Sequence, residues 1–418
     1  MDRDEFLKTS KVFCMAPWVR VLTTTSGEVL PCCPSGGSFP SAGSTRSGEL
    51  KEIWNSAYFR RLRLNMLAGE RSRQCGLCYE QEESRVPSLR RADNERFAGD
   101  FDSVEATRED GSLPRFAPRT VILEFSNRCN FRCHICEAAT SSAWIGEARR
   151  LAGVRGFPKN YVPSGILTPT REPEAFWRQI EAILPSLEEI HFLGGEPLLA
   201  REHYRALRAL LDRRLFHIRL FYNTNFSIMN FQGNDVMKMW DRFESVRVSA
   251  SLDGSGRRGE YMRKGQVWKQ AVANRRRMIQ VCPRVDFYVM PTISAMNVLH
   301  LPDFYDEMAE AGYVDPRKMD INFSLVKPAC LRVQILPPAL RRRAIEKYER
   351  HVAKMERRGG EGLQPAFGGF KGVLALLRGP RLDGRLEEFR TYIRKLDEMR
   401  GESFLDAFPE MADLMHDR

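Results

Sequence analysis

The chain has 418 residues, of which 43% are hydrophobic and 28% are charged, a balance that is ordinary for a globular protein of two or three domains. Its net charge of +11 indicates either an anionic partner or solvated helix faces, and no zinc-finger or RNA-recognition motif accompanies the basic residues to favour nucleic acid. No run approaches the roughly 20 apolar residues of a membrane-spanning helix, and the acidic Met1–Ser10 lacks the apolar core of a secretion signal, so we expect a cytoplasmic protein.

The first 90 residues hold five of the ten cysteines, which in a chain that is not secreted indicate metal sites rather than disulfides. Strand-like runs at Val19–Thr24 and Val29–Cys33 flank a turn at Gly27, and this pattern predicts a hairpin. A helix-like run, Leu50–Leu67, follows. Residues 1–90 are therefore predicted to form a small cysteine-rich domain of a hairpin and a helix.

The spacing of these cysteines predicts one site with four thiolate ligands. The hairpin would bring its first two cysteines side by side, and a C-x2-C pair would close the site after the helix. The four predicted ligands are Cys14, Cys32, Cys75 and Cys78. Such a set suits either an iron–sulfur cluster or a tetrahedral zinc ion. Because Cys33 adjoins Cys32, the sequence does not decide between these two as the second ligand.

The rest of the chain divides into a linker, an alternating strand-and-helix region and a helical end. Residues 91–117 are polar, with little periodicity, and predict a linker. Residues 118–330 alternate strands with helices, which predicts a parallel α/β sheet, and residues 331–418 predict a helical, charged region. The expected strands are Thr120–Phe125, Glu189–Leu193, His217–Tyr222, Val246–Leu252, Val285–Thr292 and Met319–Leu325. The expected helices include Glu174–Leu184, Glu202–Arg213, Gln266–Gln280 and Pro302–Ala311. Six such units are too few for a complete eight-fold barrel and predict a partial (β/α)6 barrel.

A loop directly after the first of these strands carries the most informative motif of the chain. Cys129, Cys133 and Cys136 stand in a C-x3-C-x2-C pattern. Three thiolates can hold a 4Fe–4S cluster and leave one iron without a protein ligand, although four is the usual number. A zinc site or buried core cysteines are the alternatives. The predicted site lies at the carboxyl end of a parallel strand, where active sites of such folds are found.

Together with Gly194-Gly195-Glu196-Pro197 further on, this loop resembles that of the radical S-adenosylmethionine (SAM) superfamily. The resemblance implies that the open iron binds SAM and that a supplied electron cleaves it to a 5′-deoxyadenosyl radical. The N-terminal cysteine set resembles the auxiliary-cluster module called twitch, related to SPASM, here placed before the barrel rather than after it. The run Leu396–Phe404 is also similar to that group. Two 4Fe–4S clusters and SAM are therefore the expected cofactors.

The resemblance also implies which residues contact SAM. The glycines and carboxylate of Gly194, Gly195 and Glu196 correspond to the motif that holds the amino group, which agrees with close backbone approach and with charge complementarity. Polar residues at later strand ends are candidates for the ribose and carboxylate: Asn223, Asn225, Ser249, Ser251, Asp253 and Asn297. Ile135 stands where the family usually has an aromatic residue over the adenine. Cys330 is a candidate hydrogen-atom donor or acid.

The expected function is hydrogen-atom abstraction from a substrate, with the auxiliary cluster assisting. A ribosomally made peptide is the favoured substrate, with oxidation, cross-linking or epimerisation as outcomes. The alternative is a dehydrogenation or rearrangement of a small, phosphorylated metabolite such as an aminocyclitol, sugar or nucleotide. A reductase such as flavodoxin or ferredoxin would supply the electron. A zinc-stapled nucleic-acid-binding protein is the non-enzymatic alternative, and it leaves the Gly194–Pro197 motif without a role.

Overall fold

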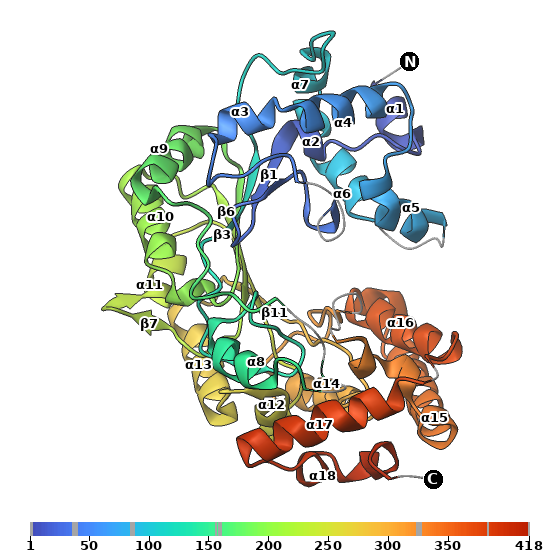
Figure 1. Ribbon diagram of the computed structural model, residues 1–418. Coiled ribbons are helices and arrows are strands. Elements are labelled where there is room, and N and C mark those ends of the chain that lie inside the picture. Colours follow the sequence, from blue (N-terminus) through green and yellow to red (C-terminus); the bar gives the residue numbers. More distant parts are fainter. Residues whose placement is uncertain are drawn as a thin grey trace. The chain divides into compact units, whose positions relative to one another are not determined.

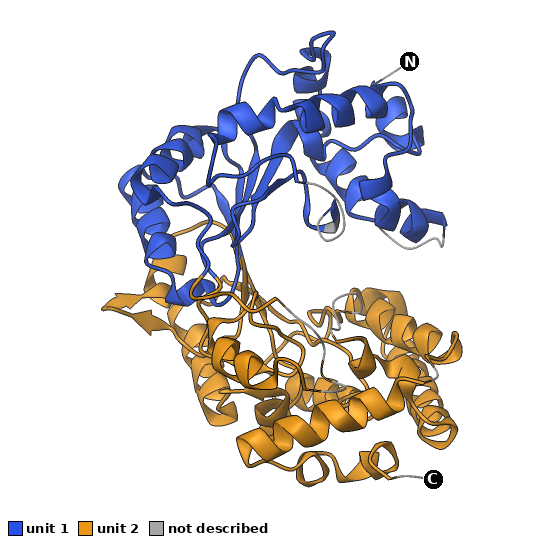
Figure 2. Ribbon diagram, in the orientation of Figure 1, with its two compact units in different colours: residues 1–126, 167–221 blue, residues 127–166, 222–418 orange. Residues whose placement is uncertain are grey.

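The computed structural model describes residues 3–35, 41–83, 88–154, 157, 161–322, 328–382 and 384–416 (Figure 1). The chain divides into two compact units, one formed by residues 1–126 and 167–221 and the other by residues 127–166 and 222–418 (Figure 2). Among the described residues, no helix combines the length and the apolar character needed to cross a membrane.

The sheet of the first unit begins with the N-terminal hairpin. Its strands are β1 (Arg20–Thr23), β2 (Val29–Leu30), β3 (Thr120–Glu124) and β5 (Glu189–Leu193). Strand β1 pairs antiparallel with β2 and parallel with β3, and β3 pairs parallel with β5. Leu22 therefore faces Leu30 on one side and Ile122 on the other, and the three side chains form one buried cluster. The predicted hairpin is confirmed, and it extends the sheet that begins with the first predicted barrel strand.

Helices cover both faces of this sheet. They are α1 (Arg3–Thr9), α2 (Ala16–Val19), α3 (Leu50–Trp54), α4 (Ala57–Leu67), α5 (Gly76–Glu83), α6 (Leu89–Arg96), α7 (Asp102–Glu105), α9 (Pro173–Ile183) and α10 (Arg201–Asp212). Phe192 of β5 packs against His203 of α10, with ring centroids 4.8 Å apart. Glu189, which points to the other face because side chains alternate along a strand, pairs with Arg96 of α6. Helices α6 and α10 therefore lie on opposite faces (Figure 1).

The segment 91–117 differs from the predicted linker. It contains the end of α6, a 3-10 turn at Ala98–Asp100 and α7. Phe97 and Asn94 are buried, and the Asn94 side chain donates to the carbonyl oxygen of Phe13, 3.1 Å away. The sequence shows no helical period here because polar contacts to the N-terminal segment, rather than an apolar stripe, fix this region. The long predicted helix Leu50–Leu67 is likewise divided, into α3 and α4.

The second unit contains the other half of the α/β region and the helical end of the chain. Strand β6 (Arg219–Thr224) spans the boundary between the units, and the later strands are β4 (Arg132–Cys133), β7 (Asn230–Phe231), β8 (Asn234–Asp235), β9 (Val246–Ala250), β10 (Arg263–Lys264) and β11 (Asp286–Val289). The helices are α8 (Ile145–Leu151), α11 (Val236–Trp240), α12 (Gly256–Met262), α13 (Trp268–Val281), α14 (Leu301–Glu310), α15 (Pro338–Arg357), α16 (Ala366–Arg378), α17 (Leu386–Arg400) and α18 (Phe404–Ala407). Strands β9 and β11 pair in parallel, and β4 and β10 pair antiparallel.

The predicted strand and helix order of residues 118–330 is confirmed, with one exception. The predicted strand Met319–Leu325 is represented among the described residues by two isolated parallel bridges, Val289 with Met319 and Thr292 with Asn322. Residues 323–325 of that prediction lie outside the described residues. The mostly parallel sheet with crossover helices agrees with the partial barrel, and residues 338–400 confirm the helical end.

Candidate functional site

The C-x3-C-x2-C loop joins the end of β3 to α8. Cys133 is buried in β4, where it lies opposite Arg263 of β10, whereas Cys129 and Cys136 are half-buried. A hydrogen bond between the thiols of Cys133 and Cys136 raises the pKa of Cys133 and lowers that of Cys136. None of the ten cysteines, all of which the structure describes, is in a disulfide. The loop therefore presents thiols of which at least two are within hydrogen-bonding distance.

Asn225, predicted from its place after β6, contacts this loop. Its side-chain amide donates to the Oδ1 of Asn130 at 2.8 Å and lies 3.9 Å from the sulfur of Cys129. Its own Oδ1 accepts from the Ser227 hydroxyl at 2.7 Å. The amide thus connects the end of a strand to the first cysteine of the motif, as the strand-end rule led us to expect.

The other predicted strand-end residues differ in how far they are exposed. Asn223 is exposed, Ser249 is buried and Ser251 is half-buried, with its backbone N–H donating to Thr224 at 2.8 Å. Ile135 is half-buried beside Cys136 in the chain. The predicted SAM contacts of these four residues stay predictions.

Asp253 and Asn297 differ from their predicted role as cofactor contacts, because both are fully buried and have partners within the protein. The Asp253 carboxylate accepts from Arg263 at 2.9 Å and from the backbone N–H of Thr292 at 2.8 Å. The Asn297 amide donates to the carbonyl oxygens of Asp253, at 3.0 Å, and Thr292, at 3.1 Å. Its Oδ1 accepts from the N–H of Ser294 at 2.9 Å. In this structure the hydrogen bonds of these two side chains fix the conformation of the loop after β9.

The Gly194–Glu196 segment lies close to the end of β3 in the first unit. Gly194 has a φ of +115°, and a Cβ atom there would stand 2.8 Å from the carbonyl oxygen of Ser126. The N–H of Gly195 donates to that same oxygen at 2.9 Å. Glu196 is buried, and its carboxylate accepts from the N–H of Leu198 at 3.1 Å, so it caps the following 3-10 turn, Pro197–Leu199. Gly194 is needed because its backbone meets the backbone of Ser126 here.

Sequence reasoning missed the residues with which α17 fixes the cysteine loop. Arg400 pairs with Glu147 of α8 at 2.7 Å, and both side chains are almost fully buried. Arg400 also donates to the carbonyl oxygen of Arg132 at 2.8 Å, and the Tyr392 hydroxyl donates to that of His134 at 2.7 Å. The run Leu396–Phe404, which the sequence analysis identified only as similar to relatives, includes this arginine. The sequence therefore indicated the run that contains Arg400, but not its partner Glu147, which lies 253 residues earlier in the chain.

Cys330 does not have the surroundings of a reactive thiol. It is buried, and burial raises its pKa to about 12. A thiolate is the reactive form of cysteine, so little of it would be present at neutral pH. The structure gives no support to Cys330 as a hydrogen donor or acid.

The four N-terminal cysteines come together around the hairpin. Gly27 has a φ of +89° at the hairpin turn, which favours glycine. Burial raises the pKa of Cys14 well above its usual range, and the charges of Asp93, Cys32 and Cys75 raise it further. Burial also raises the pKa of Cys75 to about 12, with Cys32 and Cys78 adding to the effect. Cys33 is exposed, whereas Cys32 is half-buried, so the geometry favours Cys32 as the second member of the set.

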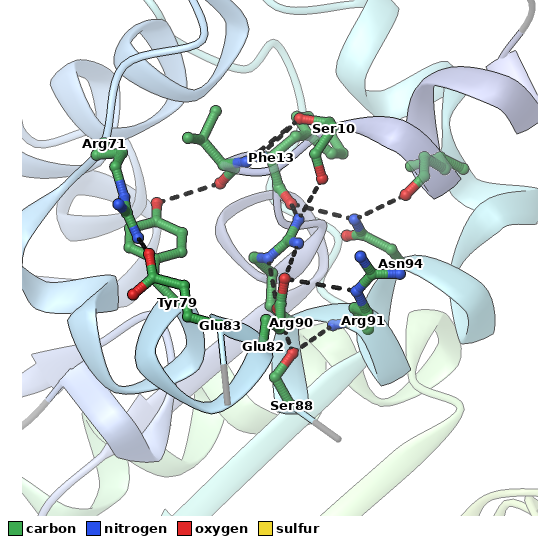
Figure 3. Close-up of polar contacts among 12 residues, drawn as sticks. Ser10, Phe13, Arg71, Tyr79, Glu82, Glu83, Ser88, Arg90, Arg91 and Asn94 are labelled. Carbon is green, nitrogen blue, oxygen red and sulfur yellow. Dashed lines mark hydrogen bonds and ion pairs between the residues drawn. The ribbon is translucent and has the colours of Figure 1, made fainter. Parts of the chain in front are cut away.

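Helix α6 holds the segments that carry these cysteines (Figure 3). Arg90 of α6 pairs with Glu82 of α5, the helix of Cys78, and donates to the carbonyl oxygens of Ser10 at 3.0 Å and Phe13 at 2.6 Å. Asn94 accepts from the backbone N–H of Met15 at 2.9 Å. The buried face of α6 thereby fixes the chain on both sides of Cys14 and the helix of the C-x2-C pair.

A buried ion pair lies beside the N-terminal cysteines. Arg20 of β1 makes two hydrogen bonds of 2.7 Å to Asp93 of α6, and both side chains are at most 4% exposed. Burial raises the pKa of Asp93 to about 6, although the charge of Arg20 opposes this. Burial raises the pKa of Cys32, and the positive charge of Arg20 opposes this rise.

The donor chemistry of both cysteine sets fits iron–sulfur clusters, whose usual ligands are cysteine thiolates. Burial disfavours the charged form of a thiol, and a bound metal would compensate because it binds the thiolate. Within the described residues, no three potential ligands already stand at metal-binding spacing. The fit therefore rests on the residue types and on their gathering at two places, the loop after β3 and the hairpin with α5.

Two family models match this chain, one over each of the two cysteine sets. Residues 123–308 match the family model of the radical SAM superfamily, and residues 14–79 match that of SPASM, an iron–sulfur cluster-binding domain. The second match contains all four predicted N-terminal ligands and precedes the first. No curated protein matches the chain.

Several solved structures match at low identity. Native anSMEcpe with bound AdoMet and Cp18Cys peptide is 14% identical over 49% of this chain and 50% of that one, with a TM-score of 0.34. Streptococcus suis SuiB bound to the precursor peptide SuiA is 13% identical over 72% and 64%, with a TM-score of 0.37. TYW1 with a lysine-pyruvate adduct bound is 11% identical over 58% and 74%, with a TM-score of 0.30. The chain thus spans half to about two thirds of the first two.

Proposed function

Because this chain is a radical SAM enzyme with a SPASM iron–sulfur domain ahead of its barrel, we propose that it abstracts a hydrogen atom from a peptide and uses an auxiliary cluster to complete the reaction. Cys129, Cys133 and Cys136 would hold the cluster whose open iron binds SAM. Bound SAM would supply the 5′-deoxyadenosyl radical, which takes the hydrogen atom. The protein would bind the substrate and aim it.

The observation that carries this proposal is the three-thiol loop after β3, within the region that matches the radical SAM superfamily. Asn225 connects the loop to the end of β6, and Arg400 connects it to α17, so that the cysteines are held from two directions. Such support is what a cluster needs to keep one coordination position open to a small molecule. Gly194, Gly195 and Glu196 are the proposed contacts of the SAM amino group.

Cys14, Cys32, Cys75 and Cys78 are the proposed ligands of the auxiliary cluster. The SPASM match over residues 14–79 supports this role. Cys33 is exposed and is not included. The auxiliary cluster would accept the electron left on the substrate, and a flavodoxin- or ferredoxin-type reductase is the proposed source of the electron that cleaves SAM.

A peptide is the proposed substrate class because the resemblance to radical SAM proteins with auxiliary clusters favours it. A cavity of about 240 Å³ in the first unit is the proposed substrate pocket, and it is lined by carboxylates as well as arginines, with Arg205 paired to Glu174 at 2.6 Å. Phe125, Trp177 and the arginines Arg201, Arg205 and Arg208 are among the residues that line it. The guanidinium of Arg205 stacks on the Trp177 ring, 4.7 Å from its centroid. Phosphorylated metabolites are the alternative substrate class, and they form the second arm of the test.

The test is anaerobic reconstitution of the full chain followed by analysis of iron, sulfide and zinc. Two clusters predict about eight irons per chain, at four per cluster. The triple variant Cys129→Ala/Cys133→Ala/Cys136→Ala should keep about four and form no 5′-deoxyadenosine with SAM and dithionite. Cys282→Ala is the matched control, because this buried cysteine lies outside both sets and its loss should leave iron and cleavage unchanged.

Substrate class is tested with the native, reconstituted chain. Peptides encoded near its gene and a panel of phosphorylated sugars and nucleotides are incubated in parallel, and mass changes and 5′-deoxyadenosine are measured. A peptide that changes mass and increases 5′-deoxyadenosine supports the proposal. The same result with a phosphorylated metabolite alone would replace it. Zinc without iron, and no SAM cleavage, would refute the enzyme assignment of the cysteine loop.

A further inference from the structure

We propose that Arg263, held in place by Asp253, is a positioning residue that directs a positive charge at the cysteine loop and raises the reduction potential of the cluster bound there. This inference rests on the proposed function, because it assumes that Cys129, Cys133 and Cys136 hold that cluster. It adds residues that the family motif does not contain and assigns Asp253 a role other than the one that the sequence suggests.

The first observation is the place of Arg263 in the strand ladder. Strand β10 pairs antiparallel with β4, and Arg263 lies directly opposite Cys133. Its Nη1 is 3.9 Å from the sulfur of Cys133, within reach of an N–H···S hydrogen bond. The arginine is only 6% exposed, so water screens its charge little.

The second observation is that Asp253 fixes the orientation of this guanidinium. Its Oδ1 accepts from Nη2 at 2.9 Å, and its Oδ2 lies 2.7 Å from Nε. The aspartate is itself held by the N–H of Thr292 at 2.8 Å. Because two nitrogens of the planar fork face the carboxylate, the third nitrogen, Nη1, is left to face the sulfur.

The third observation is that the chain after Arg263 is shaped for close approach to the cysteine loop. Gly265 has a φ of +112°, a conformation that side chains rarely adopt. A Cβ atom at this position would be 2.9 Å from the carbonyl oxygen of Asn130 and 2.8 Å from the ring of Phe131. The glycine therefore permits the short β4–β10 ladder that sets the arginine against the cysteine.

The expected effect follows from charge. Reduction adds one electron to a cluster, so a nearby cation favours the reduced form and a nearby anion disfavours it. The intact pair is close to neutral as a whole, but its arginine end faces the sulfur. Removing the arginine charge leaves a buried carboxylate, and removing the aspartate charge leaves a buried guanidinium. The two changes should therefore shift the potential in opposite directions, which a merely structural contact would not do.

The experiment measures the reduction potential of the cysteine-loop cluster by EPR-monitored titration of the full, reconstituted chain without SAM. The signal that changes when SAM is added to a second sample identifies this cluster. Arg263→Gln should shift the potential downward, Asp253→Asn should shift it upward, and the double variant should return towards the native value. Arg247→Gln is the matched control, since it breaks an exposed ion pair of 2.9 Å with Asp286 and should leave the potential unchanged.

The outcomes separate the two levels of the proposal. A native chain without a SAM-responsive cluster refutes the proposed function itself. A native chain with the cluster, but with single variants that shift together or not at all, refutes only the role of the pair. If Arg263→Gln loses its iron, Asp253→Asn decides alone, and an unchanged potential overturns the inference. Weaker SAM binding by Asp253→Asn at an unchanged potential would instead make Asp253 a SAM contact.

Discussion

Replacing Gly194 by alanine should damage the Gly194–Glu196 segment through two effects that can be separated. The first is conformational, because a φ of +115° lies outside the regions that alanine favours and costs about 1–3 kcal/mol. The second is crowding, because the new Cβ atom would stand 2.8 Å from the carbonyl oxygen of Ser126, and overpacking costs about 1–3 kcal/mol. Together they predict a loss of about 2–6 kcal/mol of stability.

Two other glycines provide controls. Gly69 also has a positive φ, +75°, but a Cβ atom there would meet nothing within 4 Å, so Gly69→Ala should show only the conformational cost, about 1–2 kcal/mol. Gly146 lies in α8 with open space around it, and Gly146→Ala should gain up to about 1 kcal/mol from helix propensity.

The assay is thermal unfolding of each variant without cofactors, followed by SAM binding to the reconstituted protein. At roughly 2 °C per kcal/mol, Gly194→Ala should lower the Tm by about 4–12 °C. It should also weaken SAM binding, because the N–H of Gly195 is hydrogen-bonded to the same oxygen that the new methyl group displaces. If Gly194→Ala melts no lower than Gly69→Ala, the crowding argument is wrong.

Three further predictions concern other parts of the chain. His203 is fully buried, and burial lowers its pKa to about 3. The stability that it contributes is therefore present above pH 6.5 and lost as the pH falls towards 3. When Tm is measured against pH, the Tm of His203→Phe should fall less in acid than that of the native chain. Arg400→Met removes the buried partner of Glu147, which keeps only the half-exposed Arg132 at 2.9 Å; the cost should therefore stay below the roughly 3–5 kcal/mol of an unpaired buried charge, both Tm and iron retention should fall, and adding Glu147→Gln should recover part of each. Cys32→Ala should lose about four of eight irons and Cys33→Ala none, as iron analysis will show; loss from Cys33→Ala but not from Cys32→Ala would reverse the assignment.

Local patterns in the sequence predicted the elements that are stabilised by a continuous apolar face. The strand Glu189–Leu193 was predicted with its observed bounds, since Ile190, Phe192 and Leu193 stand in a short run that ends at two glycines. The hairpin at Gly27 was predicted because the turn needs a positive φ. The strand expected at Met319–Leu325 was less successful, because in the described part its backbone makes only isolated bridges.

Polar elements could not be predicted in this way. Helix α6 has no apolar stripe, and its place is set by Arg90 and Asn94, which bind backbone carbonyls about 80 residues earlier in the chain. Asp253 illustrates the same limit within the site. Its position after a strand indicated a polar contact, but only the fold shows that its partner is Arg263 of β10, on the other side of α12 in the chain.

The sequence by itself determined the chemistry: three cysteines at close spacing in one loop, a second set of four, and the Gly194–Pro197 motif. These are local patterns, and ligand type depends on residue identity rather than on the fold. The tertiary structure decided which charges face those cysteines, that Arg400 and Arg263 flank the loop, and that Asp253 and Asn297 are committed inside the protein. Burial and electrostatics depend on what lies nearby in space, and residues that are distant in the chain become neighbours only when it folds.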